Sequence, residues 1–140
     1  MTASVFDHPW MSDLFAAPQI APLWGYDQQL AHLLGFEDAF TNALHHVGRL
    51  SDAQTAEALA VIAKFTPDMG ALTRGTAQDG LVIPSLVSQL RADMDHPDAI
   101  HTGATSQDVI DTALALTLQA IAATLKQDIR AIDTALSDLS

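Results

Sequence analysis

A run of twelve residues, His101 to Thr112, carries side chains that could act on a small anion. It reads His-Thr-Gly-Ala-Thr-Ser-Gln-Asp-Val-Ile-Asp-Thr, so an imidazole, several hydroxyls and an amide stand close to one glycine. Groups of these kinds bind carboxylate oxygens. At the first turn of a helix, free backbone N–H groups and the helix dipole add to the attraction for an anion. The run therefore predicts a carboxylate site.

The same run contains the start signals of a helix. Gly103 permits a turn that other residues resist, and Thr105 with Asp108 forms a Thr-x-x-Asp capping pattern. We expect the helix to begin near Ser106. The plainer alternative is a well-capped helix whose polar loop binds only water.

The elements that position this run are predicted to be helices, which gives an all-α fold. Apolar residues recur at spacings of three and four over residues 26–47, 51–66, 67–79 and 84–96, with Gly48, Gly80 and Pro97 as stop signals. We expect an N-terminal helical domain over residues 1–105. Residues 106–140 are then the start of a central bundle of long helices.

The last predicted helix has the longest apolar stripe in the sequence. The stripe is formed by Ile110, Leu114, Leu118, Ile121, Leu125, Ile129, Ile132, Leu136 and Leu139. A stripe of this length needs partner helices of similar length, and the remaining predicted helices are shorter. We therefore expect either that the chain stops within this element or that other copies supply the partners.

Composition limits the classes of function. The chain has 140 residues and no cysteine, which excludes disulfides and thiolate metal sites. Its net charge of −11 disfavours binding to nucleic acid. The N-terminus lacks the pattern of a secretory signal, and no window approaches the roughly 20 apolar residues of a membrane span. A cytoplasmic protein without membrane partners is expected.

Three segments resemble the fumarase/aspartase superfamily, and most closely its 3-carboxy-cis,cis-muconate cycloisomerase branch. The run from His101 to Thr112 resembles that branch's first signature, His-x-Gly-Ala-Thr-Ser-Gln-Asp-Val-x-Asp-Thr. Gly80 to Val87 resembles a loop with a Pro-Leu-Val run, and Phe36 to Ala39 resembles a Glu-x-Ala segment of the first long helix. The resemblance covers residues from about Phe15 to Asp128.

The resemblance implies a lyase or cycloisomerase that works without a cofactor on a polycarboxylate, such as 3-carboxy-cis,cis-muconate in the degradation of aromatic compounds. Thr105 and Ser106 would hold a substrate carboxylate, with Gln107 and His101 nearby. Pro84 and Ser85 would form another wall. Family members are homotetramers in which three subunits build each active site.

The catalytic groups of the superfamily have no counterpart in these 140 residues. A middle Thr-His and a Ser-Ser-x-x-Pro-x-Lys-x-Asn loop with the serine base are both missing from the sequence. The resemblance therefore implies an N-terminal portion that supplies substrate-binding residues and no catalytic residue. Such a portion would be inactive alone.

Other interpretations stay open at this point. An adenylosuccinate lyase-like enzyme would use the same run, and a non-catalytic helical oligomerisation module would need only the apolar stripe. No metal site is expected, because the adjacent His45 and His46 diverge on a helix and no carboxylates cluster near Asp108 and Asp111. Arg74 and Arg91 are the best local cations for a substrate carboxylate, and both could equally be surface charges.

Overall fold

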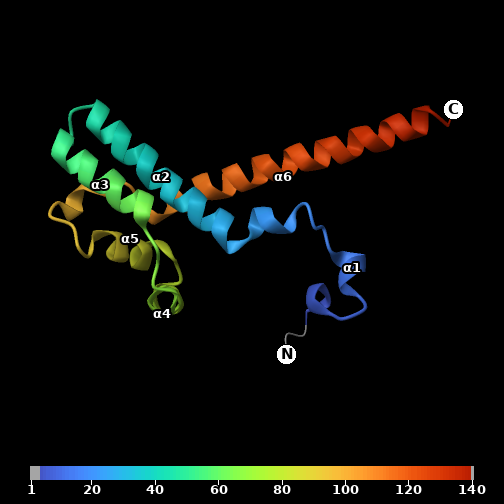
Figure 1. The fold of residues 1–140 in the computed structure, drawn as a ribbon, viewed down its shortest axis with the longest axis horizontal. Helices are drawn as coiled ribbons and strands as arrows, with labels where there is room; N and C mark the ends of the chain where they lie inside the picture. Colours follow the sequence, from blue (N-terminus) through green and yellow to red (C-terminus); the bar gives the residue numbers. More distant parts are fainter. Residues whose placement is uncertain (1–3, 140) are drawn as a thin grey trace. The chain divides into compact units, whose positions relative to one another are not determined.

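The computed structural model describes residues 4–139, and every regular element within that range is helical (Figure 1). The all-α prediction is confirmed. The α-helices are α1 (Ser12–Phe15), α2 (Tyr26–His46), α3 (Asp52–Lys64), α4 (Met69–Asp79), α5 (Ile83–Arg91) and α6 (Ser106–Ser137). Short 3-10 turns occupy Val5–Asp7, Ala21–Trp24 and Pro97–Ala99.

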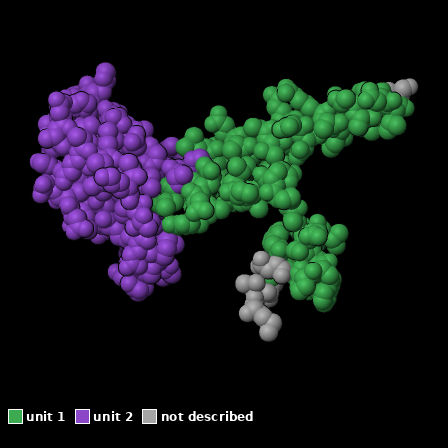
Figure 2. Space-filling view, in the orientation of Figure 1, with its two compact units in different colours: residues 1–30, 115–140 green, residues 31–114 purple. Residues whose placement is uncertain are grey.

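The chain divides into two compact units (Figure 2). One, called here the central unit, consists of residues 31–114; the other, the terminal unit, combines residues 1–30 with 115–140. Helices α2 and α6 each run from one unit into the other. The boundary predicted between residues 105 and 106 falls inside the central unit, so the division into residues 1–105 and 106–140 stays a prediction.

Local signals explain where the helices begin and end. Ser51 and Gln54 form the expected capping box at the start of α3, each accepting a backbone N–H of the other. Gly48 and Gly80 follow α2 and α4 with φ angles of 74° and 71°, a left-handed conformation that glycine adopts without strain. Pro84 lies in the first turn of α5, where its missing N–H has no helical partner to lose.

Helix α5 ends at Arg91, earlier than the expected end near His96. The carboxylate of Glu57 in α3 accepts hydrogen bonds from the backbone N–H groups of Asp95 and His96. These two N–H groups are thus turned toward α3 instead of continuing the helical ladder. Pro97 also keeps the preceding residue out of helical geometry.

The core of the central unit is formed by α2, α3, α4, α5, the segment of the Pro97–Ala99 turn and the start of α6. Its buried apolar residues include Leu33, Ala58, Ile62, Leu72, Ile83, Leu86, Val87, Leu90, Ala99, Ile100, Val109 and Ala113. Helix α4 packs against α5 where Gly75 lies against Ser85. This packing fixes the helix that carries Pro84 and Arg91.

The later part of α6 leaves its apolar stripe exposed. Leu125, Ile129, Ile132 and Leu136 are 48–65% exposed. Helix α6 is long and apolar enough to cross a membrane, which differs from the expectation that no window approaches a span. The stretch between Asp111 and Lys126 carries no charged residue, and Thr and Gln stand among its apolar residues. Length and composition are shared by a membrane span and a bundle helix, so this feature alone assigns neither.

Candidate carboxylate-binding site

The turn before α6 has the predicted capping geometry. Gly103 has a φ angle of 98°, and α6 begins at Ser106. The Thr105 backbone N–H and hydroxyl both donate to Asp108 Oδ2, at 2.8 and 3.0 Å, while the Asp108 N–H donates to Thr105 Oγ1 at 3.3 Å. These bonds from Thr105 lower the pKa of the Asp108 carboxyl. The Thr105 hydroxyl is thus engaged within the cap.

The first turn of α6 keeps polar groups available beside that cap. Within residues 4–139, no hydrogen bond takes up the Ser106 hydroxyl or the backbone N–H groups of Ser106 and Gln107. The Gln107 side chain donates to Asp111 Oδ1 at 2.6 Å, one helical turn further on. An anion at this end of the helix would therefore meet Ser106 and backbone amides more readily than Thr105 or the Gln107 side chain.

His101 is held from the other side by a buried acid. Its Nδ1 lies 2.7 Å from Oε1 of Glu37, a fully buried residue of α2. His101 has a φ angle of 61°, which is uncommon for a residue other than glycine. Burial raises the pKa of the Glu37 carboxyl; the hydrogen bond from His101 and the positive charges of His101 and Arg91 offset part of that rise.

Arg91 fixes the loop that carries His101. From the end of α5, its guanidinium donates two hydrogen bonds to the Ile100 carbonyl and a longer one, of 3.4 Å, to Thr102 Oγ1. The positive charge consequently stands next to the His101 backbone. Arg91 thus joins α5 to the loop before α6.

These groups line one cavity of about 620 Å³ within the central unit. Its lining residues are Ile83, Pro84, Val87, Ser88, Arg91, Ala92, His101 and Ser106. The wall from α5 is largely apolar, and the opposite wall carries the imidazole and hydroxyl. A cavity of this kind fits a small molecule with an apolar carbon skeleton and an anionic group.

The structure brings three of the predicted site residues together in this cavity, namely Pro84, His101 and Ser106. Ser85 lies elsewhere: its hydroxyl points to the Ala71 carbonyl of α4 at 3.4 Å, and its side chain packs on Gly75. Ser85 is therefore a packing residue between α4 and α5 in this chain. Its assignment as a substrate contact stays a prediction without a geometric basis.

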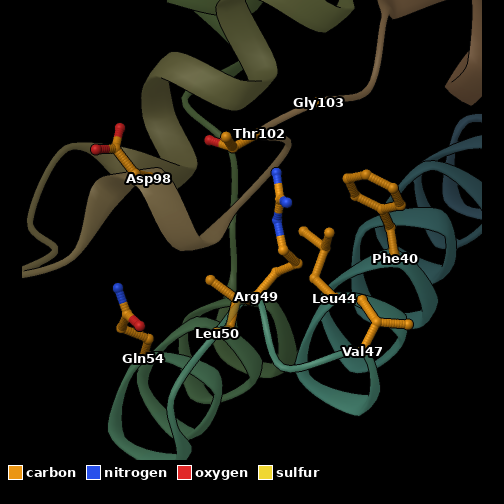
Figure 3. A pocket seen from close by; sticks show the side chains of 9 residues that line it. All are labelled: Phe40, Leu44, Val47, Arg49, Leu50, Gln54, Asp98, Thr102 and Gly103. Carbon is orange, nitrogen blue, oxygen red and sulfur yellow. The ribbon is translucent and has the colours of Figure 1, made fainter.

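A second cavity, of about 640 Å³, is lined in part by Asp98, Thr102 and Gly103 of the segment before α6 (Figure 3). Figure 3 shows the side chains of Phe40 and Leu44 from α2, and of Val47 just after it, beside the Arg49 side chain. Sequence reasoning overlooked this cavity, because its residues come from α2, α3 and the loop before α6, which only the folded chain brings together. It contains none of the predicted site residues.

Glu37 is the functional candidate that sequence reasoning named only as part of a resemblance. Leu33, Glu37 and Thr41 recur at four-residue spacing and are all buried on α2. An acid on the buried stripe of a helix is a signal of a paired or functional carboxylate. No group of three or more potential metal-ligating side chains is present in the described part of the chain.

Comparisons with known proteins add an independent line of information. No protein-family model matches the sequence. The chain is 37% identical over 105 residues to a 3-carboxy-cis,cis-muconate cycloisomerase of Bradyrhizobium diazoefficiens, a match that covers 71% of this chain and 23% of the relative. It is 26% identical over 126 residues to an adenylosuccinate lyase of Archaeoglobus fulgidus, which covers 89% of this chain and 27% of that enzyme.

A solved structure agrees with these sequence matches. The fumarate lyase from Mesorhizobium sp. BNC1 superposes with a TM-score of 0.81 at 28% identity, over 87% of this chain and 29% of that one. The chain thus spans between 23% and 29% of the length of these relatives. The matched region is large in this chain and small in each relative.

Proposed function

We propose that this chain, a member of the fumarase/aspartase superfamily, supplies the substrate-carboxylate-binding part of a lyase or cycloisomerase that works on polycarboxylates without a cofactor. The observation that carries the proposal is the cavity in which Arg91, His101 and Ser106 meet at the start of α6. Two cationic or ionisable groups and a helix N-terminus together favour a carboxylate over a neutral ligand.

The preferred substrate is 3-carboxy-cis,cis-muconate, which would be interconverted with its isomer carboxymuconolactone by making or breaking the lactone C–O bond. The cycloisomerase is the more similar of the two curated relatives described, at 37% identity against 26% for the adenylosuccinate lyase. The apolar wall of Pro84 and Val87 suits an unsaturated carbon chain better than a nucleotide. An adenylosuccinate lyase-like function is the second candidate, because its match covers more of this chain.

In this proposal the chain binds and orients the substrate, and proton abstraction belongs to groups outside these residues. Ser106 and the first amides of α6 would hold one carboxylate. Arg91 and His101 would supply positive charge to the same or a second carboxylate. The Ser-Ser-x-x-Pro-x-Lys-x-Asn loop that the superfamily uses for catalysis does not occur in the 140 residues. We expect no turnover of carboxymuconate by these residues alone.

Assembly forms part of the proposal. The exposed stripe of α6, which includes Leu125, Ile129 and Ile132, would be covered by equivalent helices of other copies in a homotetramer. Such a bundle would bury the stripe in a cytoplasmic protein without a membrane. It would also bring residues from neighbouring subunits toward the cavity.

Binding of fumarate to the ¹⁵N-labelled chain, followed by NMR, tests the proposal. We expect shifts of the Ser106 and Gln107 amides and of the His101 ring, with propionate giving smaller shifts at equal ionic strength. Arg91→Gln should weaken fumarate binding roughly tenfold or more, the value of a lost charge-assisted hydrogen bond. Arg74→Gln, which makes the same charge change outside the cavity, is the control. Equal weakening by both variants, or shifts confined to other residues, would contradict the proposal.

A further inference from the structure

We propose that Glu37 is a positioning residue of this cavity, whose buried carboxylate holds the His101 ring by Nδ1 and thereby leaves Nε2 as the nitrogen available to a ligand. This inference rests on the proposed function, because it assigns the ring atom that meets the substrate. Neither the sequence pattern nor the relatives' names assign a role to Glu37.

The geometry of the pair supports a dedicated contact. Glu37 is 0% exposed and the His101 side chain 13% exposed, with 2.7 Å between Oε1 and Nδ1. The two residues are 64 positions apart, so the contact ties the middle of α2 to the loop before α6. His101 also has a φ angle of 61°, a conformation that persists only where surrounding contacts determine it.

Core stability alone gives a poor account of Glu37. Its second oxygen, Oε2, has no hydrogen-bond partner within the described residues, although it is buried. An apolar residue at this place on the stripe of α2 would avoid the desolvation of a carboxylate, and replacing buried charged pairs by apolar residues is often neutral or stabilising. The acid is therefore better explained by what it does to His101.

The charges around the pair come from three helices. Glu37 belongs to α2, Arg91 at the end of α5 lowers the pKa of Glu37 through its positive charge, and Asp108 in the first turn of α6 feels the charge of His101. Asp108 is engaged with Thr105, and Arg91 with the Ile100 carbonyl. Glu37 is thus the acceptor that meets the His101 ring directly.

The consequence for chemistry follows from the two ring nitrogens. When Nδ1 carries a proton that it donates to Glu37, a neutral His101 presents a lone pair at Nε2. When the ring is doubly protonated, Nε2–H donates to a carboxylate oxygen in the cavity. In other proteins, a carboxylate that accepts a hydrogen bond from one ring nitrogen of a ligand-binding histidine likewise fixes the tautomer and orientation of the ring.

Histidine ¹⁵N NMR of the full chain at alkaline pH tests the inference without any ligand. We expect His101 to be protonated at Nδ1. Glu37→Leu, which removes the acceptor, should shift the ring to the form protonated at Nε2. Glu57→Leu is the matched control, since it removes the carboxylate that lies 2.7 Å from His96 Nδ1 and should leave His101 unchanged. A wild-type His101 protonated at Nε2 would overturn the inference, even where Glu37→Leu fails to fold.

Fumarate binding separates this inference from the proposed function. Glu37→Gln preserves the size of the side chain but replaces the charged acceptor of the His101 ring by a neutral amide, and should weaken fumarate binding on the order of tenfold. Wild-type binding that Glu37→Gln leaves unchanged would overturn the positioning role and leave the proposed function standing. Failure of the wild-type chain to bind fumarate would count against the proposed function, while the tautomer of His101 would still decide the role of Glu37.

Discussion

Replacing Gly75 by alanine should destabilise the central unit, although the same change inside a helix is usually favourable. A Cβ atom at Gly75 would lie 2.6 Å from Ser85 Cβ and 2.8 Å from Ser85 Oγ. Non-bonded carbon atoms pack at roughly 3.5–4.0 Å, so α4 and α5 would have to separate by about 1 Å. The close approach explains why a poor helix former stands in the middle of α4.

The sign of the effect comes from two opposing contributions. Gly→Ala in a helix interior contributes roughly 0.5–1 kcal/mol in favour of folding. Overpacking of this kind costs about 1–3 kcal/mol, because the obstacle is a short side chain attached directly to α5. We expect Gly75→Ala to lower the free energy of unfolding by about 1 kcal/mol or more. Urea denaturation followed by far-UV circular dichroism measures this difference in the free energy of unfolding between wild type and Gly75→Ala.

Two further variants identify the cause. Gly70→Ala in the same helix would meet only the side-chain ends of Arg74 and Asp68, both at 3.3 Å, and should be neutral or stabilising. Adding Ser85→Gly to Gly75→Ala should recover stability, with a coupling on the order of 1–3 kcal/mol in a double-mutant cycle. If Gly75→Ala stabilised the chain as Gly70→Ala does, the assignment of Ser85 as the residue that sets the α4–α5 distance would be wrong.

Three shorter predictions concern α6. Thr105→Ala should cost about 0.5–2 kcal/mol in urea unfolding and Thr105→Ser much less, because the hydroxyl is engaged in the cap; equal losses would refute the cap. The folded chain lowers the pKa of Asp108 from 3.8, so its stabilising effect is present above that pH and lost as pH falls through the lower folded pKa. The difference in unfolding free energy between wild type and Asp108→Asn should therefore shrink from about pH 6 to about pH 3, and a constant difference would contradict this. Ile129→Asp should reduce the mass measured by light scattering and Gln127→Asp, off the apolar stripe, should not; a wild-type monomer at micromolar concentration would refute self-association.

The helices could be predicted from the sequence because their signals are local. Ser51 with Gln54 marks the start of α3, and Thr105 with Asp108 marks the start of α6, since each pair satisfies backbone groups only three residues apart. The end of α5 was placed too late. It depends on Glu57, which reaches Asp95 from a helix 38 residues away, and no local pattern reports such a contact.

The site was predictable in part for the same reason. The polar side chains around Ser106 are consecutive in the sequence, so a binding role could be predicted from the sequence alone. In the structure, His101 and Ser106 line a cavity. The prediction for Ser85 came from the resemblance of the segment Gly80 to Val87, and in the structure its side chain lies against Gly75. The contact between Glu37 and His101 could not be predicted without knowing which face of α2 meets the loop at His101. That information arises only when the helices pack.

An acidic chain can still hold a polycarboxylate, because the charges that matter lie within a few ångströms of the ligand. At physiological ionic strength, exposed charges more than about 8 Å away are largely screened, so the net charge of −11 acts mainly on the rate of encounter. Inside the cavity, Arg91 and His101 already satisfy the Ile100 carbonyl and Glu37. A substrate would meet the rest of the Arg91 guanidinium and Nε2 of His101, together with Ser106 and the free backbone amides at the start of α6. Under the proposed function, such a set would bind and orient a carboxylate, and removal of the neighbouring proton would fall to a base on another segment or subunit.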